Sequence, residues 1–204
     1  MRIFSTQHHL DWWKNRPIDW AKDYLSTWNH PHRWYLAQKL KEVKWASIYE
    51  VGTGAGANPY ALSKVFPQAA LGGSDVSEEA IKVAQQAIPH GIFDVCPGND
   101  IIMSSHSADV VLTDMTLIYV DPFKIKSYLK EFQRIGRKYV FLVEFYHPSL
   151  WKRLKMTLAG RYTHNYPKLL EKLGCHGILI HKLPSDLYPG AHDNEYRYLI
   201  TARI

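Results

Sequence analysis

Short apolar runs alternate with amphipathic segments along the middle of the chain. Five of these runs have the length of strands: Ser47–Val51, Ala69–Gly73, Ile92–Val95, Asp109–Thr113 and Tyr139–Glu144. Between the last two, apolar residues recur at the spacing of one helical face: Ile125, Tyr128, Leu129, Phe132 and Ile135. Strands that alternate with helices are typical of βαβ units, whose strands pair in parallel. The pattern therefore predicts a parallel sheet covered by helices.

Two further strand-like runs, Gly177–His181 and Glu195–Ile204, follow near the C-terminus. The segment between them holds Pro184, Pro189 and Gly190 and shows no helical pattern. Because a parallel crossover usually needs a helix, we expect this pair to be antiparallel. The predicted fold class is α/β: a doubly wound, mostly parallel seven-stranded sheet with an antiparallel C-terminal strand and helices on both faces.

Composition narrows the class of protein. Apolar residues make up 46% and charged residues 22%, as in globular proteins. No apolar run reaches the roughly 18 residues of a membrane span, and the N-terminus lacks the apolar core of a signal peptide. We therefore expect a cytoplasmic protein with no membrane partner. Cys96 and Cys175 form no metal-binding or disulfide pattern, and we predict no metal site.

A glycine-rich turn, Glu50-Val-Gly52-Thr-Gly54-Ala-Gly56, follows the first predicted strand and precedes a helix predicted over Pro59–Phe66. Glycines tolerate positive φ and let a ligand approach the backbone closely. The N–H groups at the start of the helix point towards whatever lies above the turn. Asp75 ends the second strand, where a carboxylate can accept hydrogen bonds from both ribose hydroxyls of a nucleoside. These features together predict a nucleoside-binding site.

Residues 46–145 resemble the class I S-adenosylmethionine-dependent methyltransferases. YEVGTGAGANPYALSKVFPQAALGGSDVS resembles that family's glycine loop and ribose-binding acid, and DVVLTDMTLIYVDP resembles its strand-four motif. The resemblance implies methyl transfer with S-adenosyl-L-methionine as cofactor. It implies that Asp75 holds the ribose, that Asp114 lies beside the sulfonium, and that Glu50 supports the loop or meets the amino-acid end. The implied cofactor-binding residues are Glu50, Gly52, Thr53, Gly54, Gly56, Asn58, Asp75, Val76, Asp114 and Met115.

That family usually has an acid after strand three that bonds the adenine amino group. Counting back from Asp109 without gaps puts this position at Cys96-Pro97, where no acid stands. After a small shift Asp94, Asn99 or Asp100 could replace it. We assign Asp100 to the cofactor site, with a role as a turn residue in PGND as the alternative.

The glycine loop also satisfies the dinucleotide pattern G-x-G-x-x-A, with Ala57 as its last position. Three features favour a methyltransferase: a third glycine at position 56, Pro59 in the first turn of the next helix, and the antiparallel pair near the C-terminus. A nicotinamide-dependent enzyme and a non-catalytic nucleoside-binding protein remain alternatives.

Catalytic candidates come from the carboxyl ends of strands four and five, where ligands of open α/β sheets bind. Methyl transfer from a sulfonium mainly needs alignment and exclusion of water, so no catalytic motif is required. We name Glu144, which ends an otherwise apolar strand, and His147, whose ordinary pKa is near neutrality. The alternative for His147 is a loop histidine beside Pro148.

The basic charge is concentrated towards the C-terminus. The formal net charge is +6, and residues 145–204 hold nine Lys and Arg against four Asp and Glu. A solvated basic face and a surface for an anionic substrate both fit this excess. Because 204 residues leave little room for an added RNA-binding domain, we favour a small-molecule acceptor. The alternative is a nucleic-acid (RNA)-directed methyltransferase, or an RNA-binding module, that uses the basic C-terminal third.

We divide this single methyltransferase domain, residues 1–204, into three zones. Residues 1–45 form an N-terminal helical lid, residues 46–145 the cofactor-binding core, and residues 146–204 a substrate insert followed by the antiparallel strands. The aromatic residues of the lid either pack its own core or form an aromatic pocket for the acceptor. His30 and Arg33 could face the cofactor from this lid.

Overall fold

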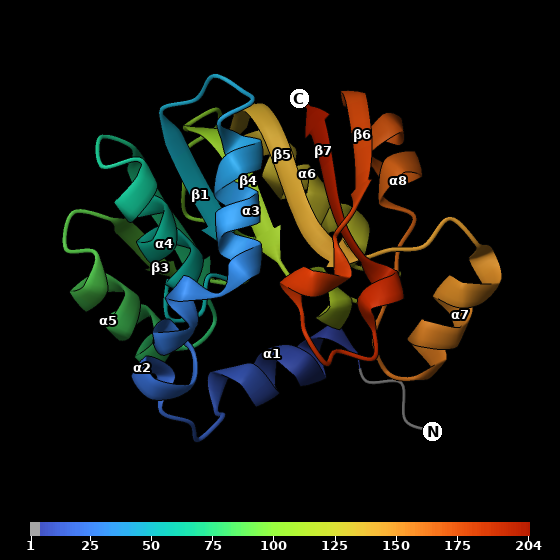
Figure 1. The fold of residues 1–204 in the computed structure, drawn as a ribbon, viewed down its shortest axis with the longest axis horizontal. Coiled ribbons are helices and arrows are strands. Elements are labelled where there is room, and N and C mark those ends of the chain that lie inside the picture. The colour runs from blue at the N-terminus through green and yellow to red at the C-terminus, as the bar shows by residue number, and fades with distance from the viewer. Residues whose placement is uncertain (1–4) are drawn as a thin grey trace.

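A seven-stranded sheet runs through the middle of the computed structural model, which describes residues 5–204 (Figure 1). The strands are β1 (Ser47–Val51), β2 (Ala70–Asp75), β3 (Ile92–Val95), β4 (Ala108–Asp114), β5 (Gly136–Phe145), β6 (His176–Lys182) and β7 (Arg197–Arg203). They lie in the order β3-β2-β1-β4-β5-β7-β6. Strands β1 to β5 pair in parallel, and β7 is antiparallel to both neighbours. The predicted sheet, with its antiparallel C-terminal strand, is confirmed.

Helices cover both faces of this sheet, as predicted (Figure 1). One layer holds α3 (Pro31–Leu40), α4 (Ala57–Val65) and α5 (Glu78–Ala87), and the other holds α6 (Ile125–Ile135) and α8 (Tyr166–Lys172). Successive strand side chains point to opposite faces. In β1, Ile48 therefore packs in the same cluster as Leu36 and Leu62, whereas Tyr49 packs in the cluster of Tyr128 and Leu129.

Side chains that accept hydrogen bonds from backbone N–H groups precede α5 and α6, but they act differently. Ser77 caps α5, with its hydroxyl accepting from the N–H of Ala80. The Asp121-Pro122 pair is typical of a helix start, but α6 begins at Ile125. The Asp121 carboxylate accepts from the N–H groups of Phe123 and Lys124, which form a turn before the helix. A side chain that can cap a helix therefore stabilises a tight turn here instead.

The N-terminal segment lies beyond the arrowheads of β1 and β4 (Figure 1). It forms α1 (Thr6–Lys14), α2 (Trp20–Asp23) and the 3₁₀ helix η1 (Leu25–Asn29); residues 1–4 of the expected lid lie outside the described part. Thr6 anchors α1, because its N–H donates to Asp121 Oδ2 at 3.0 Å and its hydroxyl accepts from the Asp121 N–H at 2.8 Å.

The remaining elements are short. The basic insert forms α7 (Leu150–Leu158), and three 3₁₀ helices complete the chain: η2 (Leu117–Tyr119), η3 (Ser185–Leu187) and η4 (Asn194–Tyr196). Within residues 5–204, no helix has the length and hydropathy required to cross a membrane.

Candidate active site

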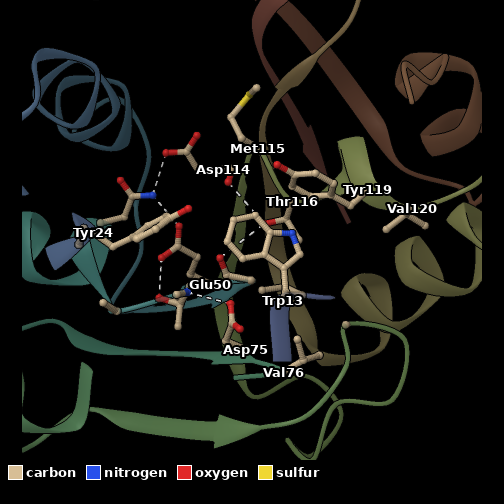
Figure 2. Close-up of a pocket in the computed structure, with 18 of the residues that line it drawn as sticks. Trp13, Tyr24, Glu50, Asp75, Val76, Asp114, Met115, Thr116, Tyr119 and Val120 are labelled. Atoms are coloured by element: carbon tan, nitrogen blue, oxygen red, sulfur yellow. Dashed lines mark hydrogen bonds between the residues drawn. The ribbon is translucent and has the colours of Figure 1, made fainter. Parts of the chain in front are cut away.

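A cavity of 340 Å³ lies at the carboxyl ends of β1, β2 and β4. Open α/β sheets bind their ligands at this edge. Glu50, Asp75 and Asp114 come from the ends of three different strands and face the same space, and Trp13 and Tyr24 of the N-terminal segment lie over it (Figure 2). The cavity is therefore the candidate active site.

The glycine loop forms the floor of the cavity. Gly52, Gly54 and Gly56 have φ values of 74°, 54° and 77°, in the left-handed region that favours glycine. At Gly52 a Cβ atom would lie 2.2 Å from Oγ1 of Thr116, so the loop and the turn after β4 touch there. Gly56 begins α4, and its Cβ would lie 2.9 Å from Cβ of Ala84 in α5. The first two glycines line the cavity, whereas the third permits close helix packing.

Asp75 is held by backbone donors. Its Oδ2 accepts from the N–H of Gly54 at 3.0 Å, and its Oδ1 accepts from the N–H of Ser77 at 2.9 Å. Burial raises the pKa of Asp75, and these two N–H groups oppose that shift. Each carboxylate oxygen can accept a second hydrogen bond. Because Asp75 also lines the cavity, its geometry fits the two adjacent hydroxyls of a ribose.

Glu50 is buried beneath the same loop, with 1% of its surface exposed. It accepts hydrogen bonds from the Thr53 hydroxyl at 2.7 Å and from the Asn58 side-chain amide. Burial raises the pKa of Glu50 to about 8 against the opposing effect of these two donors. Nδ2 of Asn58 also donates to Oδ2 of Asp114 at 3.0 Å, so Asn58 connects the loop to the end of β4.

Asp114 is the charged carboxylate of the cavity. Its Oδ2 lies 2.8 Å from Nε2 of His32 and 3.6 Å from Nη1 of Arg33. Burial opposes ionisation, but electrostatic attraction to His32 and Arg33 and the hydrogen bonds from His32 and Asn58 hold the pKa of Asp114 well below its usual range. The carboxylate is therefore ionised at neutral pH, with its partners supplied by the first turn of α3.

The sequence prediction named Arg33 but missed His32. His32 precedes Leu36 and Leu40 by four and eight positions, so it lies on the same face of α3 as these two buried leucines. The position of His32 on this apolar face could have predicted that its side chain is buried. His30, which we expected near the cofactor, caps α3 and contacts His32 through its Nδ1 at 2.6 Å, but it does not line the cavity.

A second wall beside Asp114 comes from the connection between β6 and β7. The Tyr188 ring stacks on His32, with 5.1 Å between centroids and an interplanar angle of 22°. The Arg197 guanidinium carbon lies 4.1 Å from the centre of the Tyr188 ring. Both residues line the cavity. No sequence pattern indicated either one, because Tyr188 lies in a loop and reaches the site only through tertiary packing.

The aromatic residues of the lid divide into two groups. Trp13, Trp20 and Tyr24 pack against one another and line the cavity. Trp28 and Trp34 pair with each other, with 6.1 Å between ring centroids, and do not line it. The two interpretations of this aromatic zone therefore hold for different residues: some pack within the lid, and others also face the cavity.

Most of the predicted cofactor-binding residues meet in this cavity. The residues that line it are Glu50, Gly52, Thr53, Gly54, Asn58, Asp75, Val76, Asp114 and Met115. Met115 has φ 54°, unusual for a non-glycine residue, where the chain turns out of β4. Asp100 is exposed and does not line the cavity; at this end the lining residues are Cys96 and Gly98. Cys96 is the position that gap-free counting reaches.

Glu144 and His147 lie outside the cavity lining. Glu144 is fully buried, and its Oε1 accepts from the N–H groups of Thr116 and Leu117 at 3.0 Å each. Burial raises the pKa of Glu144 to about 8. His147 accepts from the N–H of Ser149 through Nδ1 at 3.0 Å, in the turn before α7. Glu144 thus supports the turn after β4 from below, and His147 stabilises the start of the insert.

Comparisons with known proteins agree with this geometry. A family model described as a methyltransferase domain matches residues 48–138, from β1 into β5. No curated protein matches the sequence. Magnesium protoporphyrin IX methyltransferase from Synechocystis PCC 6803 with bound S-adenosylmethionine has 13% identity and a TM-score of 0.69, with 99% of this chain and 98% of that chain covered. Geranyl diphosphate C-methyltransferase from Streptomyces coelicolor A3(2), in complex with S-adenosyl-L-homocysteine, has 14% identity and a TM-score of 0.69, with 97% of each chain covered.

The family match covers the glycine loop and the ends of β1, β2 and β4 at the cavity, and these neighbours share the fold over nearly the whole chain. The glycine loop and Asp75 provide backbone and carboxylate groups suited to a nucleoside. Residues 48–138 therefore form an S-adenosylmethionine-dependent methyltransferase domain, and the whole chain has the fold of such enzymes.

Proposed function

We propose that this methyltransferase transfers the methyl group to a small-molecule acceptor by direct displacement. The main support is the cavity itself. Its volume of 340 Å³ is that of a small-molecule site, and it joins the glycine loop to the Asp114 end without a break. A polymer would need an extended groove, whereas α1 and α2 lie across this edge of the sheet (Figure 1).

In this proposal the chain's own residues bind the cofactor and set the geometry. Asp75 accepts from the ribose hydroxyls, and the backbone of Gly52 and Gly54 lies against the cofactor. The cofactor supplies an electrophilic methyl group on a sulfonium. Asp114, held ionised by His32 and Arg33, provides negative charge at the end of the cavity where the acceptor enters. Alignment within a site that excludes water is the main source of rate acceleration.

Glu144 and His147, our predicted catalytic residues, receive supporting roles in this proposal because neither lines the cavity. Asp100, which is exposed, receives no role in cofactor binding. The names of two structural neighbours give magnesium protoporphyrin IX and geranyl diphosphate as substrates, which is consistent with a small acceptor here. The cytoplasmic location stays a prediction from the sequence.

Calorimetric titration with S-adenosylmethionine and S-adenosylhomocysteine tests the cofactor assignment. Because hydrogen bonds to a charged group contribute about 1.5–3 kcal/mol, Asp75→Ala should weaken binding at least about tenfold. Asp100→Ala is the matched control, since this second aspartate is exposed and away from the cavity; it should bind as the wild type does. Equal binding by Asp75→Ala, or tighter binding of a nicotinamide dinucleotide, would contradict the assignment.

The nucleic-acid alternative depends on the basic residues of the insert. Lys152, Arg153 and Lys155 lie on α7 and do not line the cavity. A nucleic-acid-directed enzyme should be retained on heparin and bind RNA with an affinity that falls steeply with salt. We expect weak retention and no RNA-dependent release of S-adenosylhomocysteine. Methylated RNA among the products would favour the alternative.

A further inference from the structure

The helix α7 presents apolar side chains to solvent. A surface helix of a globular protein turns its apolar face towards the core and its charged face towards water. In α7 the arrangement is reversed, because Met156 is the only buried side chain among its nine described residues. Met156 packs against Ile118, Phe145 and Tyr196. The other large apolar side chains of the helix are 44% to 80% exposed: Leu150, Trp151, Leu154 and Leu158.

These four exposed side chains, which we call the α7 face, lie next to one another. Leu150, Leu154 and Leu158 are four positions apart and form one row along the helix. Trp151 is three positions before Leu154, which places its ring beside that row. Figure 1 shows α7 at the edge of the molecule, apart from the sheet and from the helices that cover it. A continuous exposed apolar patch of this kind indicates an interaction site.

Positive charges flank the α7 face. At about 100° of rotation per residue, Lys155 lies on one side of the face and Arg153 on the other. Within residues 5–204, no carboxylate pairs with either of these two cations, and Arg153 donates to two backbone carbonyls. Lys152, the third cation of the helix, pairs with Glu195 at 2.6 Å. Because α7 contains no acidic residue, its surface has an excess of positive charge.

This combination of groups fits an anionic lipid bilayer. Helices that lie on a bilayer insert Leu and Trp at the boundary between headgroups and acyl chains, while Lys and Arg reach the headgroups. Tryptophan is enriched at that boundary. A second copy of α7 fits less well, because it would bring the unpaired Arg153 and Lys155 of two copies together with no acid on either helix. RNA would attract the cations but offers no apolar surface to the leucines.

We propose that α7 binds the surface of an anionic lipid bilayer, with the α7 face inserted between the headgroups and Arg153 and Lys155 in contact with them. The affinity is modest, because it increases with the apolar area inserted and this face has four side chains. The inference is independent of the proposed function, since no residue of α7 lines the cavity. It revises the expectation of no membrane partner, which considered spanning segments and signal peptides alone.

Cosedimentation of the full chain with lipid vesicles tests the proposal. Vesicles of equal parts phosphatidylcholine and phosphatidylglycerol should bind at least about tenfold more tightly than phosphatidylcholine alone, because each cation near an anionic surface contributes about fivefold. Salt should weaken this binding. Lipids brominated in the acyl chain near the headgroup should quench the fluorescence of Trp151. Trp151→Phe should lose most of the quenching and keep the binding, since it preserves an apolar ring.

Two double variants test the apolar contribution. Leu154→Gln/Leu158→Gln should weaken vesicle binding at least about tenfold, because two apolar side chains no longer leave water, while glutamine retains helix propensity. Leu179→Gln/Ile180→Gln is the matched control, since these two side chains on the edge strand β6 are 56% and 45% exposed. It should bind vesicles as the wild type does.

Single substitutions test the charge. Lys155→Gln should weaken binding to the anionic vesicles about fivefold and leave the weaker binding to phosphatidylcholine unchanged. Lys168→Gln is its control, because Lys168 is exposed on α8, away from the α7 face. It should bind both kinds of vesicle normally.

Four outcomes would overturn the proposal. The first two are absence of vesicle binding and equal affinity for the two kinds of vesicle. The third is an equal loss in the α7 and β6 double variants. The fourth is a dimer, seen by sedimentation velocity without lipid, that Leu154→Gln/Leu158→Gln dissociates, which would assign the face to a second copy. Binding to RNA without binding to vesicles belongs to the first outcome and would assign the cations to nucleic acid.

Discussion

Two neighbouring buried carboxyl groups of the cavity are held in opposite ways. At the glycine loop, Glu50 receives neutral donors from Thr53 and Asn58, and burial raises its pKa to about 8. At the end of β4, Asp114 faces His32 and Arg33, and its pKa stays well below the usual range in spite of burial. Asn58 bonds both groups, so the two environments adjoin. Charge is therefore concentrated at the end where the acceptor is proposed to bind, and the loop end relies on neutral and backbone groups.

Substituting the two carboxyl groups one at a time should give the largest difference in stability. Asp114→Asn removes the counter-charge of Arg33 and the carboxylate that bonds His32 and leaves both side chains buried, so we expect a loss of about 3–5 kcal/mol of stability. Glu50→Gln replaces a group that the folded protein keeps protonated below about pH 8 by a neutral one of the same size. Because the unfolded wild-type chain gains free energy by ionising Glu50 and the variant does not, we expect no loss of stability at neutral pH. Denaturant unfolding at pH 7 measures both; equal losses would contradict the difference in charge state.

A smaller effect is expected at the backbone of the loop. Gly52→Ala places a Cβ atom against the Thr116 side chain at a residue with φ 74°. We expect a loss of about 2–3 kcal/mol and weaker cofactor binding. Gly160→Ala is the control, since its φ of 89° is also left-handed but nothing lies within 4 Å of the added Cβ. It should lose about 1 kcal/mol, from backbone strain alone. If both variants lose the same amount, contact with Thr116 is unimportant.

The pH dependence of stability should also distinguish the two carboxyl groups. For Glu50, the folded protein keeps a proton that the unfolded chain releases above about pH 4.5, so stability falls as pH rises from there to about 8. The slope is about 1.4 kcal/mol per pH unit for each such group, and Glu144 adds to it. Asp114 acts in the reverse direction: its contribution is present above its ordinary pKa and is lost in acid.

Unfolding of wild type and Glu50→Gln at pH 5.5 and pH 8 checks this slope. The wild type should lose more stability than the variant over that interval. Identical slopes would mean that Glu50 is ionised in the folded protein, and the difference between the ends of the cavity would disappear.

The sheet and the loop end of the cavity could be predicted because their signals are local. Each strand is a short apolar run, and the glycine loop and Asp75 lie within 26 residues of one another. The residues around Asp114 were harder to predict from the sequence, since His32, Tyr188 and Arg197 come from distant parts of the chain and meet only after folding. Glu144 shows a second limit: the end of β5 was predicted, but not that its side chain would face the turn below the cavity.

A crystal structure of the complex with S-adenosylhomocysteine tests the central claim most directly. The account predicts the ligand in this cavity, with both ribose hydroxyls at about 2.7 Å from the oxygens of Asp75 and the amino-acid end towards Asp114. A ligand bound elsewhere, or a ribose that makes no contact with Asp75, would contradict it.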